Sequence, residues 1–482
     1  MSDVPTSALV GLLVPKIPSL LKAALWNTLS LSENSSKWDL RTELTINILR
    51  SELSKPNPSS ISEQQRNSIK IPEVKGPMWV SNATMPAPPE DDVRQKLLKA
   101  IDDMKTGDET YTVPALVPVE GEWHGHRANA TKTEPDPPIS DAEKYARMMK
   151  EVKTDAVVLF FHGGAYYLMD ASSQRPSTVR YAKMLGGRTF AVRYRLSPQH
   201  PFPAPVLDAL VAYLSLLHPP PGALHDPVPA DKIIIAGDSA GGNLALTLVQ
   251  TLLQWHRDAG QQPPTLAFHG RPVAVPLPAG VALASPWADL ARALPSMRAN
   301  ARFDYLPGPD VFKASRFPHC DIWPARPPRA HLYCDAAAVL HPLASPVLAS
   351  SWERCPPVLL QVGEEMMADE AMVVAQRMAA QGVPVRWMQF EAMPHCFALL
   401  LEENPSTKVL REAWKEWGER VVRGERVGTG GEFVAAKSLA ARKVDVERLT
   451  GLTDEEVLEL MREALRKLEE GVEARTEVPP VV

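Results

Sequence analysis

The chain has few cysteines and no excess of positive charge, and each shortage excludes a class of protein. Only 4 of its 482 residues are cysteines, and their spacing fits neither a metal site nor a disulfide framework. We therefore expect reduced thiols and an intracellular, cytoplasmic location. The net charge of −5 lacks the basic footprint of a nucleic-acid-binding protein. We accordingly expect no nucleic-acid partner.

Long uninterrupted apolar runs are also missing. We expect no secretory signal peptide, and no stretch reaches the roughly 18 apolar residues of a membrane-spanning helix. Residues Ala8–Leu31 are apolar, but prolines and lysines such as Pro15 and Lys16 interrupt them. We predict an amphipathic helix over Ser19–Leu31 that packs on the rest of the chain as part of a cap. A peripheral membrane contact is the alternative, and it is less favoured because basic residues do not cluster there.

A G-x-S-x-G sequence is the most informative feature that is present. The apolar run Ile233–Ala236 leads into Gly237-Asp238-Ser239-Ala240-Gly241, and a helix is predicted over Leu244–Trp255. This strand–turn–helix context is that of a nucleophile elbow, in which a serine sits on a sharp turn and small neighbours relieve the crowding. The N-terminus of the helix also suits a developing negative charge. An ordinary glycine-rich loop is the alternative.

A second motif upstream makes that alternative less favoured. The apolar run Val157–Phe161 ends in His162-Gly163-Gly164-Ala165-Tyr166, which is an HGG-type oxyanion loop. We predict that backbone N–H groups of Gly163, Gly164 and Ala240 form an oxyanion hole. The side chains predicted to contact a substrate are His162, Tyr166 and Asp238.

A nucleophilic serine needs a general base and a carboxylate that orients it. Among the histidines after Ser239, only His395 follows a strand-like run, Val385–Glu391, at the expected place in the chain. The acid is predicted to follow the strand Pro357–Val362. Glu365 is favoured because it lies in the loop directly after that strand, and Asp369 is the alternative. Residues near Ala368 begin a helix, so Asp369 also fits a first-turn residue favoured by the helix dipole.

Taken together, these motifs resemble the hormone-sensitive-lipase-like branch of the α/β-hydrolase superfamily, in its fungal form. The resemblance covers most of Val113–Glu419 and includes the Tyr194–Ala204 run and Pro394-His395-Cys396-Phe397. It implies that the serine attacks an ester carbonyl and forms an acyl-enzyme, which water then hydrolyses. The family acid is usually an Asp in an Asp-Pro-Leu-x-Asp-type run. The matching run here, Glu365–Asp369, has Glu365 in the first acid position.

Alternating strands and helices predict an α/β fold with a mostly parallel central sheet flanked by helices. We expect a helical N-terminal cap region over residues 1–105 and an α/β-hydrolase domain over 106–422, with a cap insertion at about 289–346 before the acid-bearing strand. Residues 423–482 are predicted to be a flexible joint and a C-terminal amphipathic helix. The predicted core elements are strands Val157–Phe161, Thr189–Tyr194, Lys232–Ala236 and Val281–Ala284, and helices Pro205–Leu217 and Leu244–Trp255.

Several local predictions concern the two ends of the chain. Leu40, Leu44 and Ile48 are predicted to share one helical face. Residues Lys55–Gln65 read as a linker or mobile loop, and Glu90–Met104 as a helix. Near the C-terminus, Gly428–Gly431 is predicted to be the flexible joint. Thr453 and Glu456 form a capping box that starts a helix ending near Glu470, with an apolar stripe of Val457, Met461, Ala464 and Leu468.

The favoured function is therefore a serine carboxylic-ester hydrolase that acts on a small-molecule apolar ester and needs no metal or organic cofactor. An acyltransferase or amidase with the same triad is one alternative. A non-catalytic small-molecule binding protein on the same fold is another, although the presence of His395 argues against it. The sequence does not indicate an oligomeric state.

Overall fold

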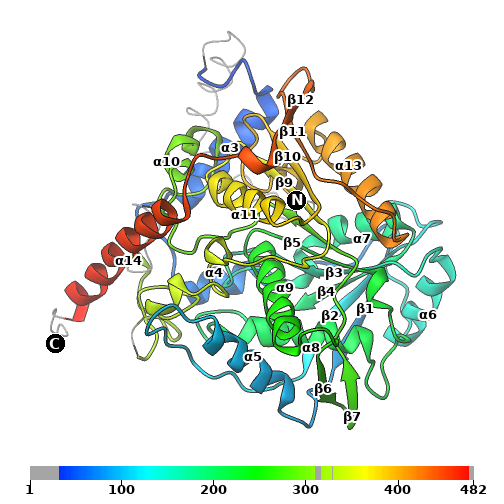
Figure 1. Ribbon diagram of the computed structural model, residues 1–482. Coiled ribbons are helices and arrows are strands. Elements are labelled where there is room, and N and C mark those ends of the chain that lie inside the picture. The colour runs from blue at the N-terminus through cyan, green and yellow to red at the C-terminus, as the bar shows by residue number, and fades with distance from the viewer. Residues whose placement is uncertain (1–31, 310–315, 328, 477–482) are drawn as a thin grey trace.

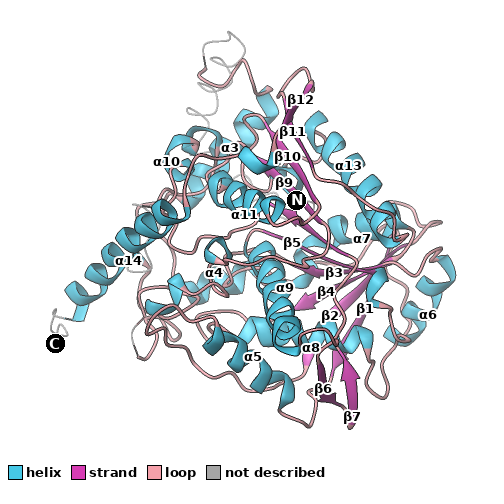
Figure 2. Cartoon of the chain, viewed as in Figure 1, coloured by secondary structure: helices cyan, strands magenta, loops and turns pink. Residues whose placement is uncertain are grey.

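A ten-stranded sheet runs through the molecule, and the predicted mostly parallel α/β architecture is confirmed (Figures 1 and 2). The structure is a computed structural model that describes residues 32–309, 316–327 and 329–476. The strand order is β1-β2-β4-β3-β5-β8-β9-β10-β11-β12. Pairing is parallel from β4 to β11 and antiparallel for β1, β2 and β12. The strands are β1 (Met78–Met85), β2 (Val119–His126), β3 (Val157–Phe161), β4 (Arg188–Arg193), β5 (Ile233–Asp238), β8 (Gly280–Ala284), β9 (Val358–Gly363), β10 (Val385–Phe390), β11 (Gly430–Val434) and β12 (Ala441–Val444).

Helices cover both faces of this sheet. Helices α8, α9 and α11 pack on one face, and α7 and α13 pack on the other (Figure 1). A separate antiparallel hairpin consists of β6 (Thr265–Phe268) and β7 (Arg271–Ala274). The helices are α3 (Leu40–Leu53), α4 (Ile61–Ser68), α5 (Asp92–Asp103), α6 (Asp141–Glu151), α7 (Arg175–Leu185), α8 (Ala204–Leu217), α9 (Ala240–Ala259), α10 (Ser296–Ala299), α11 (Ala368–Ala380), α12 (Phe397–Leu400), α13 (Pro405–Val422) and α14 (Asp454–Thr476).

The central strands are apolar on both sides because each face meets a helical layer. In β5, Ile233 and Ile235 join the core under α8 and α9. Ile234 and Ala236 point the other way and pack with residues of α13 such as Trp417. Successive side chains of a strand alternate between faces, so a continuous apolar run serves two cores at once.

The predicted elements near the elbow are confirmed, but the sequence pattern did not reveal the two strands β1 and β2 at the N-terminal side of the sheet. β1 lies within residues 1–105, which were predicted to be mostly helical, and that prediction is therefore wrong for Met78–Met85. β2 follows at Val119–His126. Its Glu122 and His124 are buried, so the strand lacks the apolar alternation by which a strand is recognised.

Two further predictions for the N-terminal part need correction. The helix around Leu44 exists as α3, but its buried residues are Thr42, Glu43 and Ile46, while Leu40 is 37% exposed. The buried face of α3 can be polar because its side chains form hydrogen bonds within the molecule. For example, the Ser32 hydroxyl donates to the Glu43 carboxylate at 2.9 Å. The predicted linker or mobile loop ends in a helix, because α4 begins at Ile61 after the cap residue Ser60.

The C-terminal part contributes to the central sheet. The prediction of a flexible joint at Gly428–Gly431 is wrong, because Gly430 and Gly431 begin β11, which pairs in parallel with β10. The capping box is confirmed: the Glu456 N–H donates to Thr453 Oγ1 at 3.2 Å, and the Thr453 N–H donates to Glu456 Oε2 at 2.8 Å. α14 then runs on to Thr476.

The helix predicted over Ser19–Leu31 lies outside the described residues. Across the part of the chain that the structure describes, no helix combines the length and the apolar character needed to cross a membrane. Short helical turns and irregular chain make up most of residues 289–346, including the 3-10 turn η6 (Ala337–Leu340). The division into cap and hydrolase domains itself stays a prediction.

Candidate active site

Ser239 lies at a strained turn between β5 and α9. Its backbone has φ 52° and ψ −120°, a left-handed conformation that costs on the order of 1–3 kcal/mol for a non-glycine residue. The flanking glycines are required by close approach, because a Cβ at Gly237 would lie 2.3 Å from the Gly241 carbonyl oxygen. A Cβ at Gly241 would lie 2.0 Å from the Phe161 carbonyl oxygen. The turn leaves Ser239 partly exposed.

Backbone hydrogen bonds hold this turn in place. The Ser239 N–H donates to the Ala284 carbonyl at the end of β8, 3.1 Å away. The Ser239 carbonyl accepts from the N–H groups of Asn243 and Trp287, both at 3.0 Å. Sequence reasoning did not single out Trp287, and the only signal for it is its place just after a predicted strand.

His395 and Glu365 meet as a buried pair. Glu365 Oε2 lies 2.5 Å from His395 Nδ1, and both side chains are almost completely buried. The second Glu365 oxygen accepts from the Gly363 N–H at 3.2 Å. Burial disfavours a charged imidazole, but the neighbouring Cys396 and Glu365 side chains outweigh it and raise the pKa of His395 above its ordinary value. This environment stabilises the imidazolium that forms when a base accepts a proton.

Asp369, the alternative acid, has different partners. Its carboxylate accepts from the N–H of Ser296 at 2.8 Å, and its own N–H donates to Ser296 Oγ at 3.1 Å. Ser296 begins α10 in the predicted cap insertion. Asp369 therefore ties α11 to that insertion, whereas Glu365 contacts the histidine.

Residues next in sequence to Ser239 and His395 bring the two together. Cys396 Sγ lies 3.9 Å from Asp238 Oδ2, and the Cys396 N–H donates to Ser285 Oγ at 3.0 Å. The described contacts of Ser239 include no hydrogen bond to the His395 ring. Such bonds are often long in unliganded enzymes and tighten when substrate binds.

The oxyanion loop after β3 is held by buried aromatic residues. The His162 ring stacks on Tyr194 with centroids 4.4 Å apart, and Tyr194 Oη donates to the His162 carbonyl at 2.6 Å. Tyr166 stacks on Tyr333 at 3.7 Å, and its hydroxyl donates to Asn243 Oδ1 at 2.6 Å. Burial lowers the pKa of His162 to about 4, so its ring is neutral.

The three side chains predicted to contact a substrate pack against other parts of the site, and their contact with a substrate stays a prediction. His162, Tyr166 and Asp238 are buried, with exposed fractions of 1%, 0% and 5%. Asp238 faces the loop, because a Cβ at Gly163 would lie 2.4 Å from its Oδ2. Burial raises the pKa of Asp238 to about 6, against the opposing effect of hydrogen bonds from Gln174 and the Gly163 backbone. The Asp238 carboxylate thus lies against Gly163, and all three side chains support the loop.

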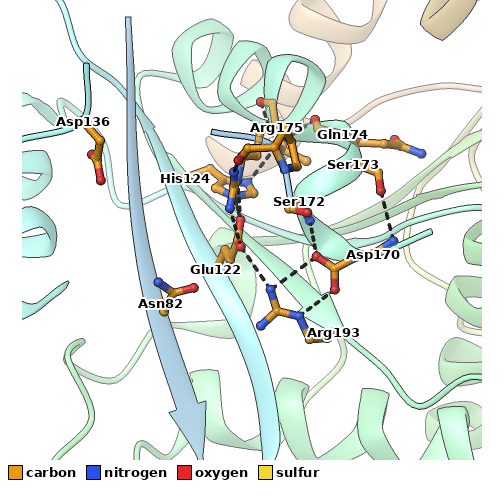
Figure 3. Close-up of polar contacts among 12 residues, drawn as sticks. Asn82, Glu122, His124, Asp136, Asp170, Ser172, Ser173, Gln174, Arg175 and Arg193 are labelled. Carbon is orange, nitrogen blue, oxygen red and sulfur yellow. Dashed lines mark hydrogen bonds and ion pairs between the residues drawn. The ribbon is translucent and has the colours of Figure 1, made fainter. Parts of the chain in front are cut away.

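A buried ionic network lies near the edge of the sheet (Figure 3), and Gln174 beside it is close enough to Asp238 to lower the pKa of that carboxyl. Asp170 caps the 3-10 turn η2 (Ala171–Gln174) that ends at Gln174. Arg193 binds Asp170 at 2.6 Å and Glu122 at 3.1 Å. Arg175 binds Glu122 through two contacts of 2.8 Å. Sequence reasoning missed this network because its members are far apart in the chain.

An apolar cavity lies beside the elbow and the oxyanion loop. Ala165, which follows Gly164, and Trp287, which donates to the Ser239 carbonyl, both line it. Most of its other walls come from the segment after β8 and from the predicted cap insertion. The lining residues are Ala165, Tyr167, Trp287, Leu290, Ala291, Arg292, Pro309, Ala330, His331, Leu332 and Leu468.

Comparison with known proteins gives the class of this fold. A family model described as alpha/beta hydrolase fold matches residues 158–399, half of the chain. A solved structure of an esterase from the bacterial hormone-sensitive lipase family has a TM-score of 0.52 and 22% identity. That match covers 80% of this chain and 99% of the other, and it shows the shared fold. The chain belongs to the α/β-hydrolase family.

Three relatives of known name indicate which kind of α/β hydrolase the chain resembles. An acetyl-hydrolase of Streptomyces hygroscopicus is 33% identical over 242 residues, which are 49% of this chain and 67% of that protein. An esterase of Acinetobacter venetianus is 27% identical over 266 residues, 54% of this chain and 74% of the relative. Human hormone-sensitive lipase is 31% identical over 107 residues, 22% of this chain and 10% of that lipase. These relatives identify the chain as an ester hydrolase of the α/β-hydrolase family.

Proposed function

We propose that the protein is a serine carboxylic-ester hydrolase that cleaves an apolar ester through an acyl-enzyme. The observation that carries this proposal is the buried contact of 2.5 Å between Glu365 and His395 next to the strained Ser239 elbow. A nucleophile, a base and a carboxylate that orients the base are the three parts that acyl transfer to serine requires.

In the proposed reaction, Ser239 Oγ attacks the ester carbonyl carbon while His395 Nε2 takes the hydroxyl proton. Glu365 holds Nδ1 and stabilises the imidazolium. The imidazolium then donates its proton to the leaving alcohol, and the acyl group stays on Ser239. His395 next deprotonates a water molecule, which attacks the acyl carbon. The bond from the acyl carbon to Ser239 Oγ then breaks, His395 returns the proton to Oγ, and the carboxylic acid leaves. Such proton transfers contribute about 10²–10⁴-fold to a rate.

The developing oxyanion needs donors that are already in place. The proposed donors are the backbone N–H groups of Gly164, in the oxyanion loop, and Ala240, the first residue of α9. This choice is supported by the start of α9 directly after the nucleophile. Gly163, which the sequence also predicted, is given a supporting part because the Asp238 carboxylate lies against it. Removing one such donor costs about 10²–10³-fold in kcat.

The first experiment measures hydrolysis of p-nitrophenyl esters from acetate to palmitate by the wild-type protein and by Ser239→Ala. We expect turnover by the wild type and a loss of turnover by at least about 10³-fold in the variant. The chain-length profile also reports how large an acyl group the protein accepts.

The control is the fold of the variant. Circular dichroism and urea unfolding are expected to be close to wild type, since removing one partly exposed hydroxyl deletes no buried contact. Wild-type activity in folded Ser239→Ala would contradict the proposed nucleophile. Absence of any hydrolysis by the wild type would favour a binding role on the same fold.

A further inference from the structure

The C-terminal helix α14 lies outside residues 158–399, the part that the family model matches. Its first turns hold it firmly on the molecule. Val457 and Met461 are completely buried, and Arg377 of α11 forms an ion pair with Asp454 at 2.5 Å. α14 also contacts η6 in the predicted cap insertion. The helix is thus docked through its first turns, and it extends from there along the margin of the molecule, with its C-terminal end pointing away from the body (Figure 1).

The docked face of α14 continues to Leu468. Val457, Met461, Leu465 and Leu468 are spaced by three or four residues, so they lie on one side of the helix. Leu465 is buried and Leu468 is half-buried. Leu468 lines the apolar cavity together with Ala165 of the oxyanion loop. Leu468, near the end of the chain, thereby contributes a wall to a cavity that is also lined by Ala165 and by Trp287, whose backbone N–H donates to the Ser239 carbonyl.

The chemistry of this cavity suits an uncharged, apolar chain. Its lining is mostly aliphatic and aromatic, as with Trp287 and Leu290. Burial lowers the pKa of His331 to about 4, so that ring is neutral. The Arg292 guanidinium donates to the Pro307 carbonyl at 2.6 Å. The lining has few polar groups, and the Arg292 guanidinium is already hydrogen-bonded within the protein. Such a lining is typical of a pocket that selects a ligand by its size and shape.

We propose that α14 forms part of the substrate pocket and that Leu468 is a specificity-determining residue, which limits the length of the apolar chain of the ester. This inference rests on the proposed function, because the cavity serves as a substrate pocket only if Ser239 attacks an ester. Acyl and alcohol chains share the same apolar chemistry, so the experiment separates them.

The test compares Leu468→Ala and Leu468→Trp with the wild type on two substrate series. One series varies the acyl chain of p-nitrophenyl esters, and the other varies the alcohol of alkyl acetates, followed by acid release. Leu458→Ala is the matched control, because Leu458 is also a half-buried leucine of α14 but does not line the cavity. The readout is kcat/KM for the long-chain ester divided by kcat/KM for the short-chain ester.

We expect Leu468→Ala to raise this ratio on the order of tenfold in one series, because a side chain that limits pocket length is shortened. Leu468→Trp should lower the ratio in the same series, and Leu458→Ala should leave it unchanged. A change confined to the acyl series assigns the cavity to the acyl chain, and a change confined to alkyl acetates assigns it to the alcohol.

Two results would overturn the proposal while the proposed function stands. One is an unchanged ratio in both series for both Leu468 variants. The other is an equal loss of activity on every ester, which indicates a structural role for the helix. If the wild type shows no Ser239-dependent hydrolysis of any ester, the proposed function fails and the pocket assignment fails with it.

Discussion

The part of the chain that the structure describes contains two buried histidine–glutamate pairs, which differ in what surrounds them. In one, His395 Nδ1 lies 2.5 Å from Glu365 Oε2. In the other, His124 Nε2 lies 2.9 Å from Glu122 Oε2. The second ring nitrogen of His124 also has a partner, because Nδ1 lies 2.7 Å from Thr178 Oγ1. His395 has instead the Cys396 side chain as its second neighbour, and Cys396 Sγ lies 3.9 Å from Asp238 Oδ2 of the Ser239 elbow.

The two histidines also differ in the direction in which their pKa values are shifted. Glu122 also binds Arg175, and burial together with that cation lowers the pKa of His124. The pKa of His395 is instead raised, with Glu365 among its causes. The comparison teaches that a buried histidine–carboxylate contact is not by itself a catalytic feature. The His395 pair lies beside the Ser239 elbow and suits a base, whereas the His124 pair, with both ring nitrogens engaged and an arginine beside it, suits a structural anchor.

The largest expected effect is the loss of the carboxylate that orients His395. Glu365→Gln should lower kcat/KM for a p-nitrophenyl ester by about 10³–10⁴-fold, because the imidazolium loses its partner and the ring its orientation. Asp369→Asn is the matched control, since Asp369 contacts Ser296 rather than the histidine. Its kcat/KM should stay within tenfold of wild type. A larger loss of kcat/KM in Asp369→Asn than in Glu365→Gln would indicate that Asp369, and not Glu365, is the carboxylate that orients His395.

The second effect concerns the structural pair. Glu122→Gln should lower the free energy of unfolding by about 3–5 kcal/mol, because Arg175 is left as a buried charge without its carboxylate. Urea unfolding measures this change. Activity per folded molecule should be close to wild type, which is the opposite outcome to that for Glu365→Gln.

Glu120→Gln is the control on the same strand. The Glu120 side chain is 60% exposed, and its contact with Arg193 is 3.4 Å, so the change should cost no more than about 1 kcal/mol. Equal destabilisation by both variants would show that the buried network does not anchor the edge of the sheet.

The smallest effect is a shift in pH dependence. A general base must be neutral, so kcat/KM should fall as the pH decreases through the pKa of His395. Because that pKa is raised above the ordinary histidine value, the fall should begin at a higher pH than for an unperturbed histidine. In Glu365→Gln the carboxylate that contributes to this increase is absent, so the residual activity should persist to lower pH. A fall at the same or a higher pH in the variant would contradict this cause.

Local patterns in the sequence predicted the elbow well because the residues that build it are neighbours. The apolar strand, the glycines around Ser239 and the start of α9 lie within a few residues of one another. His395 could be predicted for a similar reason, since it follows a strand that the sequence reveals. The choice between Glu365 and Asp369 could not be made, because Ser296, the partner of Asp369, is far away in the chain.

Strands that contain buried charged residues or several glycines were not predicted from the sequence. β2 has low strand propensity at Glu122 and is stable because Arg175 and Arg193 neutralise that carboxylate. β11 begins with Gly430 and Gly431, which read as a joint, and only pairing with β10 makes it a strand. The support that Asp238 gives to Gly163 depends on the packing of two separate loops, which no local pattern expresses.

The measurement that tests the central claim most directly is active-site labelling. The wild type, Ser239→Ala and His395→Ala would be treated with a fluorophosphonate, and mass spectrometry would locate the label. The account predicts a single modified residue, Ser239, in the wild type, no label in Ser239→Ala, and strongly slowed labelling in His395→Ala. Rapid labelling of Ser239→Ala at another residue, or no labelling of a wild type that hydrolyses esters, would contradict Ser239 as the nucleophile.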